Sequence, residues 1–255
     1  MEIKRINLVG FGNVGQALYK QLVGKVEIVD VYTRSRNISL AKKWDISFTN
    51  NIKDLSSDVD LNIIAIPDSA IHEIAVTLNK DLPVVHTSGG VSKEVLVAFS
   101  SFGIFYPLQT FTKGISVDFS VIPFFIEANT NQFENVLLKF AKDHFSASVY
   151  IANSETRKYI HLSAIITSNF LTYFLGIAED ILKEKNVPID VLKSLLNETL
   201  RKSIASGPKM SLTGPAARGD REIIDDYKEM LSDLDFKKIF SLVNEKIFNQ
   251  DFTVL

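Results

Sequence analysis

One helix-like stretch of the sequence gathers residues that are suited to acid–base chemistry. His161, Ser168 and Thr172 are spaced seven and four residues apart, which places them nearly on one line of an α-helix, with Asn169 adjacent. Histidine exchanges protons near neutral pH, whereas a buried histidine with two hydrogen-bond partners and no chemical role is at least as common. His161 and Asn169 are therefore candidate catalytic residues. We interpret His86, which follows a strand-like run, as a hydrogen-bonded structural residue.

Further polar residues follow three apolar runs that are typical of buried strands. These segments are Pro67-Asp68, His86-Thr87-Ser88-Gly89-Gly90 and Pro107-Leu108-Gln109-Thr110-Phe111. Ligands of open parallel sheets bind beyond the carboxyl ends of the strands. We therefore expect the three segments to lie on one rim of a sheet.

Each segment of this rim offers different chemistry. We expect Gln109 and Thr110 to orient a substrate carbonyl or carboxylate, and Tyr106 to donate a proton. Ser88 and Gly89 favour a close approach of the backbone to nicotinamide or substrate, and a plain tight turn is an equal alternative.

A glycine-rich turn follows the first strand-like run and opens a helix-like one. Its sequence is Gly10-Phe11-Gly12-Asn13-Val14-Gly15, a G-x-G-x-x-G pattern in the context that dinucleotide binding requires. Gly10 permits the tight turn, Gly12 lets the backbone approach a pyrophosphate, and Gly15 allows close packing of helix and strand. The first N–H groups of the helix would face the phosphates. We predict that all six residues bind a dinucleotide; the alternative is a turn without a ligand.

The end of the second strand-like run discriminates between the two dinucleotides. Asp30 could bond the ribose of NAD, but the apolar run continues through Tyr32 and leaves Asp30 inside the strand. Thr33-Arg34-Ser35 then falls at the strand end, where a guanidinium between two hydroxyls suits the 2′-phosphate of NADP, and Arg36 adds a cation. We predict NADP(H), with NAD(H) as the less favoured alternative. The other cofactor-binding residues that we predict are Ile66, Pro67, Ser88 and Gly89.

Short strands that alternate with helices must position these residues. Strand patterns cover 3–9, 26–32, 61–66, 83–87, 104–106 and 121–127, and helix patterns cover 13–22, 39–43 and 69–78. This alternation predicts an α/β fold, a doubly wound and mainly parallel Rossmann sheet over residues 1–152. Residues 153–255 form a second, all-helical domain with helices at 154–185, 189–205, 222–231 and 236–248, which we expect to complete the substrate cleft.

Composition excludes several classes of protein. Hydrophobic residues make up 46% and charged residues 23%, and the formal charge of −2 gives no reason to expect nucleic acid or an anionic membrane as a partner. Without cysteine the chain has no disulfide, thiolate nucleophile or cysteine-ligated zinc, and we predict no metal site. Polar residues interrupt every apolar run before the roughly 18 residues of a membrane helix. We expect a cytoplasmic protein.

Several of these motifs resemble a known superfamily. The turn Gly10–Gly15, Thr33-Arg34-Ser35 and Ile64–Asp68 are similar to the 6-phosphogluconate dehydrogenase and pyrroline-5-carboxylate reductase superfamily. More narrowly, the chain resembles Rossmann-like NADP-binding proteins with a C-terminal helical domain of unknown function. The segments that carry this likeness are Tyr106–Phe111, His161 with Asn169-Phe170, and Leu212–Asp220. The resemblance implies a helical domain like that of 6-phosphogluconate dehydrogenase, which often forms a homodimer, and an NADP-type cofactor.

The chain departs from this superfamily at two places. The β-hydroxyacid dehydrogenases have a catalytic Lys followed four residues later by Asn, whereas here Lys158 is followed at that spacing by Leu162. Many members of the narrower group have His where this chain has Tyr106. The chemistry of the hydroxyacid dehydrogenases is therefore not carried over.

These features favour an NADP(H)-dependent oxidoreductase that acts on a small polar carbonyl or imine substrate. The residues on the substrate side would be Thr110, Arg218 and Asp220, with a structural salt bridge as the equal alternative for Arg218 and Asp220. A non-catalytic NADP-binding sensor or regulatory protein is the alternative that the missing Lys/Asn pair suggests.

Overall fold

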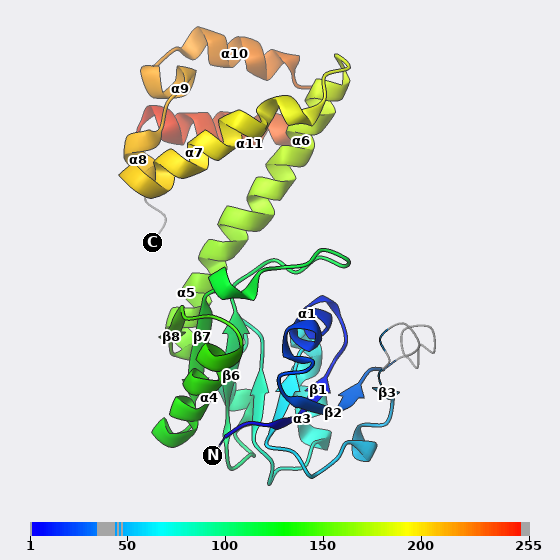
Figure 1. Cartoon of the computed structure of the whole chain (residues 1–255). Helices are drawn as coiled ribbons and strands as arrows, with labels where there is room; N and C mark the ends of the chain where they lie inside the picture. Colours follow the sequence, from blue (N-terminus) through cyan, green and yellow to red (C-terminus); the bar gives the residue numbers. More distant parts are fainter. Residues whose placement is uncertain (1, 35–43, 45, 47, 251–255) are drawn as a thin grey trace. The chain divides into compact units, whose positions relative to one another are not determined.

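The computed structural model of the chain describes residues 2–34, 44, 46 and 48–250. In this part of the chain, eight strands form one sheet in the order β3-β2-β1-β4-β5-β6-β7-β8 (Figure 1). The strands are β1 (Arg5–Val9), β2 (Glu27–Tyr32), β3 (Phe48–Thr49), β4 (Leu61–Ile64), β5 (Val84–His86), β6 (Phe102–Pro107), β7 (Phe124–Ala128) and β8 (Val149–Ile151). Neighbouring strands are parallel except β6 and β7. The predicted α/β class and mainly parallel, doubly wound sheet are confirmed.

The chain winds in opposite directions from β1, so that β1 and β4 flank the topological switch point of the sheet. In such sheets the crevice at the switch point, beyond the carboxyl ends of the strands, is where ligands bind. Gly10 directly follows β1, and Ala65 directly follows β4. The architecture therefore places the glycine turn in the crevice.

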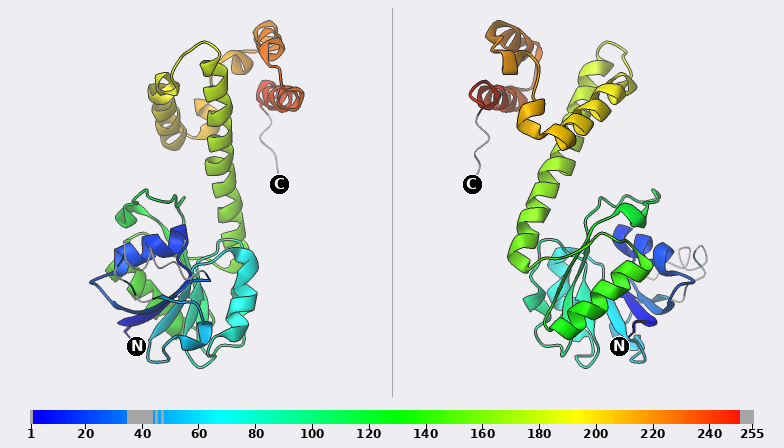
Figure 2. Two further views of the ribbon diagram at one scale, coloured as in Figure 1. Left: turned by 90° about the vertical axis from the view of Figure 1, so that its right-hand side faces the viewer. Right: turned by 60° about the vertical axis from the view of Figure 1, so that its left-hand side comes forward.

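Helices cover both faces of the sheet (Figure 2). Alternate residues of a strand point to opposite faces, so Leu8 and Val9 belong to different cores. The core around Leu8 packs against α1 (Asn13–Leu22) and α4 (Asn131–His144). The core around Val9 packs against α3 (Ile71–Thr77). Burial on both faces explains why these strands read as continuous apolar runs in the sequence.

Helix α4 and the strands β3 and β8 of this sheet domain were absent from the sequence prediction. Thr130 caps helix α4, and its hydroxyl accepts a hydrogen bond from the backbone N–H of Phe133. Its buried residues Phe133, Leu137, Phe140 and Ala141 recur at helical spacing. The strand β8 that follows pairs with β7 at the edge of the sheet.

The second strand ends as the sequence indicates. β2 continues to Tyr32, so Asp30 lies inside it, where its carboxylate accepts a hydrogen bond from the N–H of Ser56 at 2.7 Å. The carboxylate of Asp30 is thus engaged in a hydrogen bond within the sheet domain. The predicted helix at 39–43, Ser35 and Arg36 lie outside the described residues.

A single long helix follows β8, as predicted, but its middle is not α-helical. It consists of α5 (Ser154–Ala164), a π-helical segment (Ile165–Phe170) and α6 (Leu171–Lys183). A π-turn holds one residue more than an α-turn. Within the segment the hydroxyls of Thr167 and Ser168 donate to the carbonyls of Ser163 and Ala164. By length and composition alone, Ser154–Lys183 is apolar enough to cross a membrane.

The chain divides into two compact units, Met1–Tyr173 and Phe174–Leu255. The boundary predicted from the sequence, between 152 and 153, marks the change from sheet to helices, and the compact units divide later, within the long helix. Besides the end of α6, the second unit contains α7 (Lys193–Ser206), α8 (Pro208–Ser211), α9 (Pro215–Arg218), α10 (Arg221–Met230) and α11 (Leu234–Phe248).

Candidate active site

The glycine turn ties together the ends of three strands. The N–H of Gly10 donates to the carbonyl of Tyr32 at 2.9 Å, which holds the end of β2 beside the turn. Gly10 has a φ of 111°. A Cβ atom there would lie 2.3 Å from the carbonyl oxygen of Ala65 and 2.5 Å from Cγ2 of Ile66. Only glycine fits between β1 and the end of β4.

The next two glycines shape the space in front of α1. A Cβ on Gly12 would meet nothing within 4 Å, whereas one on Gly15 would lie 2.2 Å from the carbonyl oxygen of Gly10. Gly15 therefore lets the helix pack on the turn itself, rather than chiefly on a strand as the sequence suggested. Gly12 caps α1 without a side-chain hydrogen bond, and the first turn has no acidic residue. The start of α1 is thus an uncapped helix N-terminus beside the open space at Gly12, an arrangement that suits a pyrophosphate.

The other residues of the turn have distinct surroundings. The ring of Phe11 is buried among Tyr19, Trp44 and Phe48, so only its backbone can face a ligand. Val14 is half-buried. The side chain of Asn13 donates to the carbonyl of Phe111 at 2.9 Å, which ties the turn to the loop after β6.

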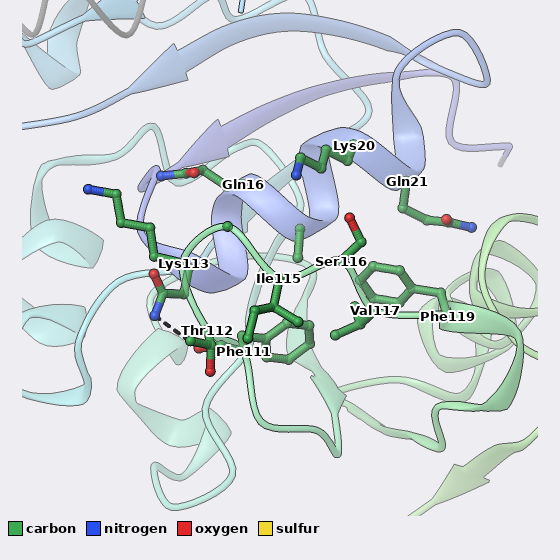
Figure 3. A pocket seen from close by; sticks show the side chains of 13 residues that line it. Gln16, Lys20, Gln21, Phe111, Thr112, Lys113, Ile115, Ser116, Val117 and Phe119 are labelled. Atoms are coloured by element: carbon green, nitrogen blue, oxygen red, sulfur yellow. Dashed lines mark hydrogen bonds between the residues drawn. The ribbon is translucent and has the colours of Figure 1, made fainter.

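A cavity of about 190 Å³ lies between α1 and this loop (Figure 3). Its lining includes Asn13, Gln16 and Lys20 from α1 and Phe111 and Lys113 from the loop. Of the predicted site residues that the structure describes, Asn13 alone lines the cavity. The cavity is thus adjacent to the glycine turn and separate from the candidate catalytic residues.

Thr33 and Arg34, the two described residues of the set predicted to select NADP, follow the end of β2. Thr33 is half-buried and its N–H donates to the carbonyl of Thr49 at 3.0 Å. Arg34 follows with an exposed side chain. The hydrogen bond between Gly10 and Tyr32 joins the glycine turn to the end of β2, and Arg34 follows Tyr32 by two residues. Pro67, after Ile66, is exposed at the neighbouring strand end.

Tyr106 and His161 form the central pair of the candidate site. The hydroxyl of Tyr106, at the end of β6, lies 3.1 Å from Nδ1 of His161 on α5, and either group can donate according to the histidine tautomer. Burial raises the pKa of Tyr106 to about 12, although the charge of Arg157 opposes this rise. The phenol is therefore protonated at neutral pH and can donate a proton.

Gly89 stands directly against this pair. A Cβ at position 89 would lie 2.7 Å from Nδ1 of His161 and 2.7 Å from Cζ of Tyr106. At Gly90 a Cβ would lie 3.5 Å from Oδ2 of Asp68 and 3.7 Å from Cδ2 of His161. The structure therefore brings Tyr106, Gly89 and His161 together, although they come from three separate predicted segments.

His86 has the structural role that the sequence favoured. Its Nδ1 accepts a hydrogen bond from the N–H of Ser88 at 3.2 Å, so the proton of the neutral ring is on Nε2, which lies 3.3 Å from the carbonyl oxygen of Ser92. The hydroxyl oxygen of Ser88 in turn accepts the N–H groups of Gly90 and Val91. This predicted cofactor residue thus shapes its own turn.

Acid should destabilise the protein through His86. Burial lowers the pKa of His86 from its ordinary 6.5 to about 4, while the hydrogen bond to Ser92 opposes the change. As the pH falls, the unfolded chain binds a proton at His86 at a higher pH than the folded chain does, so the stability that depends on a neutral His86 is complete above pH 6.5. We expect the free energy of unfolding to fall by about 3 kcal/mol between pH 6.5 and pH 4. Urea unfolding across this range checks the loss; His86→Gln should flatten the pH dependence, and an unchanged slope would contradict the assignment.

Among the described residues, no hydrogen bond joins Gln109 or Thr110 to the Tyr106–His161 pair. Both are exposed in the loop after β6, and Oε1 of Gln109 accepts hydrogen bonds from the N–H and the hydroxyl of Thr110. The carboxamide of Gln109 therefore turns back on its own loop. Their roles on the substrate side stay predictions.

The π-helical segment changes which residue aligns with His161. In a regular helix Ser168, seven residues on, would share its face. One additional residue in the π-turn shifts this register, so Asn169 takes the place of Ser168. Asn169 is exposed, and its Oδ1 lies 3.0 Å from the hydroxyl oxygen of Ser168. The sequence singled out both Ser168 and Asn169, and only the π-helical segment in the structure indicates which of the two aligns with His161.

Sequence reasoning missed a buried charge network beside His161. The guanidinium of Arg157 is fully buried and donates to Glu127 at 2.6 Å and to the carbonyl of Val91 at 2.5 Å. Lys93 and Ser154 also donate to Glu127, at 2.7 and 2.8 Å. Burial would raise the pKa of Glu127, but these hydrogen bonds outweigh burial and lower it. A single arginine four residues before the candidate histidine was the available signal.

In the second unit, Arg218 and Asp220 form the salt bridge that the sequence offered as an alternative. The guanidinium lies 3.1 Å from Oδ2 of Asp220, across Gly219. Gly219 has a φ of 82° and ends α9 in the left-handed conformation. The pair thus closes the turn between α9 and α10.

The C-terminal half of the chain matches a described family. Residues 122–247 match the family model "Domain of unknown function (DUF2520)". This match begins just before β7 and extends into α11, so it joins the last two strands to the helices. No curated protein matches the chain significantly.

Solved structures give the broader comparison. A "putative NADP oxidoreductase" from Bacteroides fragilis is 34% identical, with 97% of this chain and 98% of that one covered and a TM-score of 0.88. The chain belongs to the family of this protein. Its Rossmann-like fold is the one that the sequence motifs indicated.

More distant structures share the fold alone. The 1-pyrroline-5-carboxylate reductase of Streptococcus pyogenes is 16% identical over 96% of this chain and 97% of its own, with a TM-score of 0.62. The reductive aminase of Aspergillus terreus, in complex with NADPH and ethyl levulinate, is 12% identical over 98% and 95%, with a TM-score of 0.68.

Proposed function

We propose that the protein is an NADP(H)-dependent oxidoreductase that reduces the C=N or C=O bond of a small polar compound. The observation that carries this proposal is the Tyr106–His161 pair, a protonated phenol within 3.1 Å of an imidazole on the ligand-binding rim of a dinucleotide-type sheet. Such a pair suits the proton transfer that must accompany hydride addition.

The residues of the crevice fit the cofactor. The open space at Gly12 and the uncapped start of α1 would hold the pyrophosphate, and Thr33 and Arg34 would hold the 2′-phosphate of the adenosine ribose. Ser35 belongs to the same proposed set. When bound, NADPH supplies a hydride to the substrate carbon.

The chain itself would supply the proton. As the carbon of the C=N or C=O bond gains a hydride, the nitrogen or oxygen gains electron density and takes the proton of the Tyr106 hydroxyl. Nδ1 of His161, at 3.1 Å, can then return a proton to the phenolate and recover its own from solvent. We further propose that Asn169, Gln109 and Thr110 orient the substrate.

Two related activities suggest the first substrates to try. The distant structures include a pyrroline-5-carboxylate reductase and a reductive aminase, both of which act on C=N bonds. The consumption of NADPH should therefore be followed with 1-pyrroline-5-carboxylate, and with ethyl levulinate plus an amine.

Arg218 and Asp220 are proposed to contact substrate only if their salt bridge opens.

Replacing Arg34 should separate the two dinucleotides. We expect Arg34→Ala to weaken NADPH binding about 10- to 100-fold, because charge-assisted hydrogen bonds contribute about 1.5–3 kcal/mol, and to leave NADH binding unchanged. Calorimetric titration of each nucleotide measures both affinities. Arg201→Ala, which removes an exposed guanidinium from α7, is the control. Equal loss of both nucleotides would contradict the assignment, and no binding to the parent protein would reject the function.

We also propose that the protein is a cytoplasmic homodimer. Tyr159, Leu162, Ile166 and Phe170 follow one another three or four residues apart on the long helix, and each is about half exposed. Such a stripe suits burial against another helix. A second copy of the chain would cover it and account for the hydropathy of this helix without a membrane. Sedimentation velocity measures the oligomeric state; no membrane or nucleic-acid partner is proposed.

A further inference from the structure

We propose that Arg157 is a positioning residue of the active site, which holds the turn at 88–91 and His161 in register. This inference rests on the proposed function. Arg157 itself is fully buried behind the site and is not a catalytic residue.

The guanidinium of Arg157 joins three separate parts of the chain. One terminal nitrogen, Nη1, donates to Glu127 on β7, and the other, Nη2, donates to the carbonyl of Val91 in the turn after β5. Nη2 also lies 3.3 Å from the hydroxyl of Ser154 at the start of α5. A planar fork can make these bonds at once, whereas the single ammonium of a lysine cannot reproduce them.

The bond to Val91 controls the position of Gly89. The hydroxyl of Ser88 accepts the N–H groups of both Gly90 and Val91, so residues 88–91 form one tight turn. Holding the carbonyl of Val91 therefore holds the whole turn. Gly89 lies in this turn and leaves no room for a Cβ against Tyr106 and His161.

The same arginine controls the helix on the other side of the contact. Arg157 and His161 are four residues apart and lie on one face of α5. The ion pair with Glu127 anchors Arg157 to the sheet, and this anchor fixes the turn of α5 that precedes His161. One buried side chain, Arg157, thus holds both Gly89 and His161 in position.

Charge gives Arg157 a second influence on the pair. Arg157 and Lys93 both bond Glu127, so two cations share this carboxylate; Lys93 also lies 3.5 Å from the exposed Glu94. The charge of Arg157 lowers the pKa of Tyr106, against burial and the charge of Asp68, which raise it. The guanidinium therefore favours proton donation by Tyr106.

The decisive variants are Arg157→Lys and the pair Arg157→Met with Glu127→Leu. Arg157→Lys keeps the positive charge but loses the planar fork of hydrogen-bond donors. The double variant replaces the buried ion pair with apolar side chains, an exchange that preserves folding in other proteins. For each folded variant we expect kcat for imine reduction to fall at least tenfold, with KM for NADPH within about twofold of the parent value. Arg201→Lys, on the surface of α7, is the matched control.

Nuclear magnetic resonance of the His161 ring tests the positioning directly. In the substrate-free parent protein we expect one set of ring signals with Nδ1 hydrogen-bonded, and in either Arg157 variant broadened or multiple sets. This readout needs no turnover, so it remains valid if no substrate is reduced. A folded variant with parent-like kcat and unchanged ring signals would overturn the proposal, because a purely structural arginine would alter only stability.

Discussion

Gly89→Ala is expected to lower turnover by roughly a hundredfold while the protein stays folded. The new Cβ would lie 2.7 Å from both Nδ1 of His161 and Cζ of Tyr106, closer than real Cβ atoms approach other atoms. At least one ring must move by about 1 Å, and misplacement of that size can cost about 10²-fold in rate. The proton donor and its partner would no longer share a hydrogen bond.

The adjacent glycine offers a matched control for this result. A Cβ at Gly90 would lie 3.5 Å from Asp68 and 3.7 Å from His161, which are ordinary contacts. Gly90→Ala should therefore keep turnover within a fewfold of the parent value. Steady-state rates with the best imine substrate compare the two, and circular dichroism checks their folding. Equal activity of both variants would show that Tyr106 and His161 do not act as a pair.

Gly10→Ala is expected to cost about 3–5 kcal/mol of the free energy of unfolding. The φ of 111° is unfavourable for alanine, and the added Cβ would collide at 2.3 Å with the backbone carbonyl oxygen of Ala65. No side-chain rotation can relieve a clash with backbone. The ends of β1, β2 and β4 would have to separate, which also removes the crevice for the cofactor.

Gly12→Ala should produce the opposite combination of effects. Gly12 has a φ of −73° and open space in front of it, so alanine costs at most about 1 kcal/mol as a poorer helix cap. The same methyl group would occupy the space proposed for the pyrophosphate, and NADPH affinity should fall more than tenfold. Urea unfolding and calorimetric titration of both variants separate stability from binding. Unimpaired NADPH binding by Gly12→Ala would place the cofactor elsewhere.

Local patterns account for what could be predicted from the sequence. The glycine turn, the extension of β2 to Tyr32 and the position of Asp30 inside that strand each depend on residues close together in the chain. Strands that are buried on both faces read as continuous apolar runs, so the parallel sheet was accessible too. The antiparallel pairing of β7 with β6 was not, because direction depends on the connection rather than on the strand.

Long-range pairing accounts for what could not be predicted. Arg157 meets Glu127 across 30 positions and Val91 across 66, and no periodicity connects such residues. The register of Asn169 with His161 was missed for another reason: the helical spacing assumed for the whole stretch fails at the π-helical segment. The sequence supplied Tyr106, Gly89 and His161 as separate candidates, and only the fold shows that they touch.

The contact of Gly89 with both rings also restricts how this family can evolve. Any side chain at position 89 requires a smaller or displaced residue at position 106 or 161. Substitutions at the three positions should therefore occur together across relatives, and glycine should accompany every Tyr–His pair. Because the test needs only sequences, it can identify which relatives share this site and which have rebuilt it for other substrates.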